Sequence, residues 1–191
     1  MTSATLPDTD PVIAATRAWL EDAVIGLNLC PFAKAVHKHG RIRFAVSQAT
    51  ETESLAADLD TALRHIDATD PLTTDTTLLI HPYVLADFID YNAFLKTADR
   101  IVKRLGLRGV IQIASFHPEY VFADCEAGDI ENYTNRSPYP MLHLLREDSI
   151  TRAVATFPDP EAIYATNIAT LRRIGLAGWQ ALGRDRKDRE E

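Results

Sequence analysis

The chain has 191 residues, of which 46% are hydrophobic and 25% charged, with a net charge of −7. This composition is that of a globular protein, and it excludes disorder, collagen and coiled coil. The acidic balance argues against nucleic acid as a partner, and no apolar run approaches the ~18–20 residues of a membrane span. The first ten residues lack a signal-peptide pattern and the two cysteines form no CxxC pair, so we expect a cytoplasmic protein with reduced thiols.

The pattern predicts one α/β domain over residues 10–183, between a flexible tail at 1–9 and a charged flexible tail at 184–191. Asp10-Pro11 starts a helix to about Leu29, Thr50 and Glu53 form a capping box, and Asp87 caps a helix that stops at Gly106. In chain order, the expected helices are 10–29, 32–38, a helix from Thr50 to about Ile66, 87–106, 149–156 and 160–182. The expected strands are 41–47, 76–80 and 109–116, with 120–122 and 141–145 as candidates for a fourth.

The alternation of strands and helices favours a parallel or mixed sheet of three to five strands covered by helices, followed by C-terminal helices. A ferredoxin-like α+β sandwich is the alternative. In an open α/β sheet, ligands bind outside the carboxyl ends of the strands. We therefore examined the residues that follow each predicted strand.

Two histidines each follow a predicted strand and each precede a proline. His81 follows the second strand and His117 the third, and Ser47 lies at the end of the first. Parallel strands would bring these side chains to one edge, and proline holds the preceding residue in an extended conformation. This arrangement suits acid–base groups or metal ligands, although a His-Pro pair can also simply end a strand.

The segment from Tyr120 to Pro140 is a long stretch without clear periodicity, and loops of this length in compact domains are usually functional or disordered. Its prolines, aromatic residues and hydrogen-bonding side chains indicate an ordered loop. The guanidinium of Arg136 could clamp the carboxylate or phosphate of a small anionic molecule, with Tyr120, Asn135 and Ser137 as further binding residues. Alternatively, Arg136 forms an ion pair with a carboxylate of its own loop.

A third histidine, His143, follows this loop among apolar residues, which is typical of a hydrogen-bonded core residue. Three imidazoles, those of His81, His117 and His143, could bind zinc or ferrous iron. Two of these imidazoles together with Glu119 could also do so. Glu119 could otherwise act as a general base. The spacing contains no paired-ligand motif, so the metal hypothesis depends on how the chain folds.

Cys30 offers a different chemistry. It lies just before the predicted helix 32–38, where backbone N–H groups and Lys34 would lower the pKa of its thiol. With a histidine as base it would act as a nucleophile or redox thiol. The alternative is a buried, inert cysteine among apolar neighbours.

Four stretches of the chain resemble a bacterial family catalogued only as a domain of unknown function. They are LNLCPFA at 27–33, LLIHP at 78–82, IQIASFHPEYVF at 111–122 and NYTNRSPYPMLHLLRE at 132–147. The resemblance covers nearly the whole chain except its tails. It implies a single-domain protein whose signature segments include Cys30, His81, His117, Arg136 and His143, and it implies no activity.

Three functions follow as hypotheses. The first is an enzyme acting on a small anionic metabolite at a histidine-rich site, as a metal-dependent hydrolase or oxygenase or through acid–base groups alone. The second is a thiol enzyme or redox protein based on Cys30. The third is a protein that binds a ligand or partner in the same pocket without catalysis.

Overall fold

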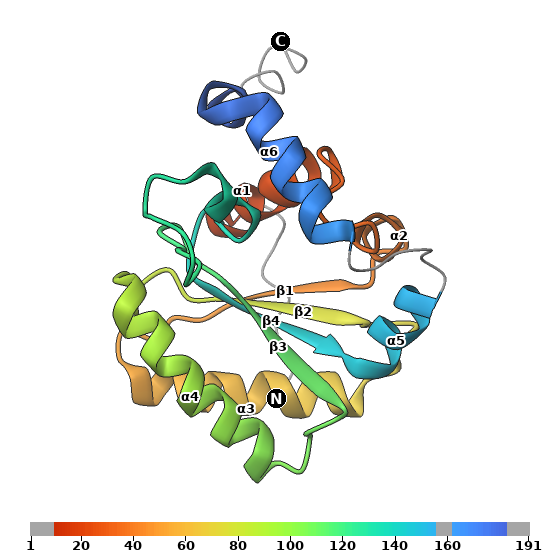
Figure 1. Ribbon diagram of the computed structural model, residues 1–191. Helices are drawn as coiled ribbons and strands as arrows, with labels where there is room; N and C mark the ends of the chain where they lie inside the picture. Colours follow the sequence, from red (N-terminus) through yellow and green to blue (C-terminus); the bar gives the residue numbers. More distant parts are fainter. Residues whose placement is uncertain (1–9, 156–161, 183–191) are drawn as a thin grey trace.

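The computed structural model describes residues 10–155 and 162–182, and the two predicted tails lie outside these ranges. A mixed sheet of four strands forms its centre, in the order β1-β2-β4-β3 (Figure 1). The strands are β1 (Ile42–Val46), β2 (Thr76–Ile80), β3 (Ile111–Phe116) and β4 (Met141–Arg146). The predicted strands are therefore present to within two residues at each end, β4 is the fourth strand, and 120–122 is not a strand.

The direction of each strand determines which loops meet. β1 and β2 are parallel, whereas β4 runs antiparallel to both β2 and β3. The carboxyl ends of β1, β2 and β3 therefore share one edge of the sheet with the start of β4. Ile80 and Phe116, the last residues of β2 and β3, both pair with Met141. We call this side of the sheet the carboxyl edge.

Helices cover both faces of the sheet (Figure 1). On one face, α3 (Thr52–Ala68) and α4 (Phe88–Arg104) pack against inward side chains such as Leu79, Leu142 and Leu144. On the other face lie α1 (Pro11–Trp19), α2 (Ala33–Lys38) and α6 (Ala162–Ala181), while α5 (Glu147–Ala155) continues from β4. Helices on both faces fit the predicted α/β class and not the ferredoxin-like alternative.

The helix starts follow local capping chemistry in two cases and depart from it in one. The Asp10 and Asp87 side chains cap α1 and α4 as predicted, by accepting backbone N–H groups of the first turn. The predicted capping box of Thr50 and Glu53 is wrong. α3 begins two residues later with Glu51 at the cap position and no side-chain capping bond. The helix start has only a backbone hydrogen bond at this position, from the N–H of Leu55 to the carbonyl of Glu51.

The first predicted helix is interrupted before its expected end at Leu29. After α1 the chain widens into a π-helical turn, η1 (Leu20–Ile25). Asn28 then adopts a positive φ of 54°, which turns the chain toward Cys30. No helix in the described ranges 10–155 and 162–182 is both long enough and apolar enough to cross a membrane.

Candidate functional site at the carboxyl edge

His81 and His117 both lie against one aromatic ring at the carboxyl edge. That ring is Tyr91, which α4 places in the core with no exposed surface. Its centroid is 5.8 Å from the His81 ring, which is stacked nearly parallel to it, and 5.0 Å from the His117 ring. The fold thus brings together two histidines that are 36 positions apart in the sequence.

The Tyr91 hydroxyl joins the ends of β3 and β4. It accepts the N–H of Phe116 at 3.1 Å and donates to the carbonyl of Met141 at 2.8 Å. These two residues are paired in the ladder, so the hydroxyl occupies the place of a direct backbone bond. Burial raises the pKa of Tyr91, and the phenol stays protonated as this arrangement requires.

His117 uses both of its ring nitrogens within the protein. Its Nδ1 accepts the N–H of Glu119 at 3.0 Å, so the proton resides on Nε2, which donates to the carbonyl of Leu85 at 3.1 Å. Burial lowers the pKa of His117, and the carboxylates of Glu119 and Asp87 oppose that effect in part. The neutral ring therefore fastens the end of β3 to the loop between β2 and α4.

His81 uses only one of its ring nitrogens. Nδ1 lies 3.0 Å from the carbonyl of Val84, an acceptor, so Nδ1 carries the proton. Nε2 is then an acceptor, and it is buried without a hydrogen-bond partner among the described residues. The side chain has no exposed surface, and burial lowers its pKa to about 4. At neutral pH His81 is an uncharged ring with one unused lone pair.

Ser47 lies beside His81 on the neighbouring strand. The register of β1 and β2 pairs Val46 with Ile80, and the N–H of Ser47 continues the ladder by bonding to Ile80 at 2.7 Å. The Ser47 hydroxyl donates to Asp58 of α3 at 2.5 Å and accepts the N–H of Ala49 at 3.1 Å. The Ser47 hydroxyl proton is donated to the Asp58 carboxylate, so it is not available to Nε2 of His81.

Sequence reasoning missed Asp58 and the role of Tyr91. Tyr91 lies on the apolar face of α4, among buried aliphatic side chains. The available signal was that a buried tyrosine needs a hydrogen-bond partner for its hydroxyl. The partners of that hydroxyl, Phe116 and Met141, are set by the register of β3 and β4.

His143 does not join the other two histidines. It lies in the middle of β4, between Leu142 and Leu144, and these two leucines face α3 and α4. Side chains alternate along a strand, so His143 faces the opposite side of the sheet. Its Nε2 contacts the Thr76 hydroxyl at 2.6 Å, and burial lowers its pKa to about 4.

The predicted set of three histidine ligands is therefore not formed. Glu119 is exposed and is hydrogen-bonded to His117 through its backbone N–H. Within residues 10–155 and 162–182, no group of three His, Cys, Asp or Glu side chains could hold a metal ion. The structure thus gives no site for the zinc or iron considered from the sequence.

Arg136 is bound within its own loop through backbone carbonyls. Its Nε donates to Tyr120 at 3.3 Å and one terminal nitrogen donates to Ala127 at 2.6 Å, while the guanidinium lies 4.4 Å from the centroid of Tyr133. This differs from the expected pair with a loop carboxylate. The guanidinium holds the two ends of the loop together.

The other predicted binding residues of this loop also have structural contacts. The Asn135 amide donates to the carbonyl of Ser115 at 3.1 Å, and the Ser137 hydroxyl donates to the carbonyl of Tyr139 at 2.7 Å. The Tyr120 ring packs 5.1 Å from the ring of Phe88. Through Tyr120 the loop contacts Phe88 of α4, whose ring also packs against Tyr91 and His117.

Cys30 lies apart from these groups, in the turn between η1 and α2. The backbone N–H groups of Phe32 and Ala33 lower the pKa of its thiol, but burial has the larger effect and the net pKa is raised. The predicted lowering of the pKa at a helix start is therefore outweighed. The protonated thiol is the stable form at neutral pH, which does not favour a nucleophilic role.

The comparisons with known proteins identify a family without a described activity. No curated protein and no solved structure matches this sequence. One family model matches residues 11–181, which is nearly the whole described chain. The chain belongs to the family described as Protein of unknown function (DUF1415).

Proposed function

We propose that this protein is an enzyme in which Nε2 of His81 accepts a proton from a small molecule bound at the carboxyl edge. The observation that supports this most is the buried, unpartnered lone pair of Nε2. Leaving a buried acceptor without a partner costs about 1–3 kcal/mol, so such groups are rare in native proteins. A ligand that donates a hydrogen bond to Nε2 would remove this cost on binding.

The protonation state of His81 restricts what the ligand can be. The ring is neutral at neutral pH and its proton is held by Val84, so Nε2 can only accept. The complementary group is a hydroxyl or a water molecule bound with the substrate. His81 would position that oxygen and take its proton as the oxygen attacks an ester carbonyl carbon of the substrate, and the protonated ring would then return the proton to the departing alkoxide.

The expected anionic character of the substrate receives no support from this edge. Two of the Arg136 nitrogens are bonded to loop carbonyls, and the carboxylates near His117 are negative. A neutral hydroxyl compound fits these charges better than a phosphate or carboxylate. We therefore propose a small, hydroxyl-bearing substrate.

Access to His81 requires movement of the loop between β2 and α4. The ring has no exposed surface, and the loop carbonyls of Val84 and Leu85 are held by His81 and His117. Leu85 has a positive φ of 59°, a conformation that is strained for a leucine. Strain at this residue lowers the cost of opening the loop, which makes it the element that would admit the substrate.

The proposal predicts that His81→Asn removes turnover while preserving the fold. The asparagine amide can still donate to Val84 in place of Nδ1, but it has no atom at the position of Nε2. We expect activity to fall about 10²–10⁴-fold, the usual contribution of a general base. The assay follows acid release by the purified full chain on a panel of neutral, hydroxyl-bearing carboxylic esters, with phosphate esters and hydroxy acids as the anionic comparison.

The matched control is His65→Asn, which changes an exposed histidine of α3. It should leave turnover unchanged. Turnover that persists undiminished in His81→Asn would contradict the proposal, as would binding of hydroxyl compounds without conversion of any of them.

A further inference from the structure

β3 forms one outer edge of the sheet, and its outward backbone groups can be identified from the ladder. The N–H of Glu147 bonds to the carbonyl of Val110 at 2.9 Å, so Val110 faces β4. Backbone groups alternate along an antiparallel strand. Those of Ile111, Ile113 and Ser115 therefore face away from β4, toward the open side of the sheet.

Other parts of the chain close this stretch of edge at both ends. The N–H of Ile111 donates to the carbonyl of Leu107 at 2.9 Å, and the side-chain amide of Asn135 donates to the carbonyl of Ser115 at 3.1 Å. These two neighbours occupy the space that a pairing strand would need. The window between them runs from the Ile111 carbonyl to the Ser115 N–H and is about 10 Å long at ~3.4 Å per residue. It therefore admits a small molecule and excludes a strand.

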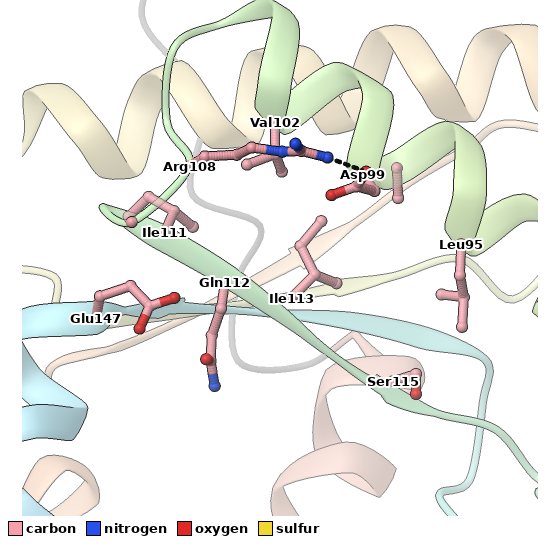
Figure 2. A pocket seen from close by; sticks show the side chains of 11 residues that line it. Leu95, Asp99, Val102, Arg108, Ile111, Gln112, Ile113, Ser115 and Glu147 are labelled. Atoms are coloured by element: carbon pink, nitrogen blue, oxygen red, sulfur yellow. Dashed lines mark hydrogen bonds and ion pairs between the residues drawn. The ribbon is translucent and has the colours of Figure 1, made fainter.

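A hollow of about 330 Å³ lies beside this window, between β3 and α4. Its walls include the aliphatic side chains of Leu95, Val102 and Ile113. Figure 2 shows Ile113 directed toward α4 and Gln112 directed to the opposite side of the strand. Because Gln112 also lines the hollow, it does so through its backbone, and the hollow reaches the edge of the strand. Its volume is in the range of small-molecule sites.

The unbonded backbone groups of the window determine which ligand it can bind. Among residues 10–155 and 162–182, no hydrogen bond satisfies the carbonyl of Ile111, either group of Ile113 or the N–H of Ser115. In chain order these groups are an acceptor, a donor, an acceptor and a donor. The two groups of Ile113 have the close spacing of a bonded pair in an antiparallel ladder. They match a planar ring edge that carries an acceptor and a donor on adjacent atoms.

We propose that this window binds the adenine base, as adenine or adenosine. N1 of the base accepts the N–H of Ile113, and its 6-amino group donates to the carbonyl of Ile113. N7, the acceptor on the other side of the amino group, then faces the N–H of Ser115. The edge of adenine thus presents an acceptor, a donor and an acceptor to a donor, an acceptor and a donor of the chain.

The other bases do not match this order. In hypoxanthine and guanine the donor and the acceptor at positions 1 and 6 are exchanged. Turning the ring over restores the match to Ile113 but places N7 against the carbonyl of Ile111, an acceptor against an acceptor. Cytosine pairs with Ile113 through N3 and its amino group, and its O2 then meets the same carbonyl. The window therefore selects adenine among these bases.

The charges around the hollow favour an uncharged ligand. Arg108 lines it but is paired with Asp99 at 2.6 Å, and Glu147 contributes a second carboxylate. Among the described residues that form the lining, no other cation is available for a phosphate. Negative charge here repels a phosphorylated ligand. This pattern fits adenine or adenosine better than a nucleotide.

Calorimetric titration of the full chain with adenine and with adenosine tests the site. We expect both to bind, and AMP to bind more weakly than adenosine. Purine, which lacks the 6-amino group, and hypoxanthine should each bind at least about tenfold more weakly than adenine, because a backbone group of Ile113 then has no partner. Equal affinity for adenine and hypoxanthine would overturn the proposal, as would a chain that binds neither adenine nor adenosine.

Amide exchange locates the bound base. The amides of Ile113 and Ser115 should exchange more slowly as adenine is added. Those of Ile111 and Ala114 are internal controls, because Leu107 and β4 bond them in the free chain. Adenine binding that leaves exchange at Ile113 unchanged would place the base elsewhere and contradict the assignment.

A pair of tryptophan variants tests the hollow itself. Leu95→Trp fills it from the side of α4 and should remove adenine binding. Gln112→Trp adds the same ring on the opposite side of β3 and should leave binding unchanged. A folded Leu95→Trp chain that binds adenine as well as the wild type would count against the site. These measurements do not depend on the activity of His81.

Discussion

Tyr91→Phe is expected to destabilise the protein more than the loss of one oxygen atom usually does. The hydroxyl bridges the N–H of Phe116 and the carbonyl of Met141 in the fully buried core. Its removal leaves the N–H of Phe116 and the carbonyl of Met141 without this hydrogen-bond partner. Each buried backbone group that is left unsatisfied costs about 1–3 kcal/mol. Urea unfolding followed by circular dichroism measures the change.

Tyr120→Phe is the matched control for this substitution. Its hydroxyl makes one long contact, 3.4 Å from the Ser115 hydroxyl, so the expected loss is within about 0.5 kcal/mol, as for a typical surface change. Equal losses in the two variants would show that the Tyr91 bridge does not hold β3 to β4.

The free energy of unfolding is expected to fall steeply as the pH is lowered from 6.5 toward 4. Burial lowers the pKa of both His81 and His143 to about 4, from 6.5. Between these values the unfolded chain binds protons that the folded chain does not, so protonation favours unfolding. The stabilisation is complete above pH 6.5 and is lost as the pH approaches 4, at up to about 1.4 kcal/mol per pH unit for each group.

His81→Asn should flatten this dependence, because asparagine does not titrate. His143→Gln should reduce it further by a similar amount, because burial lowers the pKa of both rings to about 4. His117 contributes with the same sign, since burial also lowers its pKa. Chemical unfolding at a series of pH values gives the slope. A stability that stays constant over this range in the wild-type chain would contradict the burial of neutral histidines.

Much of the fold follows from local patterns in the sequence. Runs such as TTLLI and IQIASF fixed the positions of β2 and β3, and Asp87 fixed the start of α4. The antiparallel direction of β4 did not follow, because the segment between Phe116 and Met141 is long enough to return to the sheet in either direction. The strand order depends on packing between distant parts of the chain.

The candidate site could be predicted only in part for a similar reason. That His81 and His117 follow strands is a local feature, and parallel β2 and β3 bring them to one edge. His143 was grouped with them because all three are histidines. The alternation of β4 places it on the other face, which becomes clear only when Leu142 and Leu144 are known to face α4.

The most direct test of the account is the tautomer of His81, measured by long-range ¹⁵N–¹H NMR correlation of the imidazole rings near neutral pH. We predict a neutral ring with the proton on Nδ1 and the nitrogen shift of a free acceptor at Nε2. His117 should show the reverse tautomer, with its proton on Nε2. A His81 ring that is protonated on Nε2, or charged, would contradict the proposed proton acceptor.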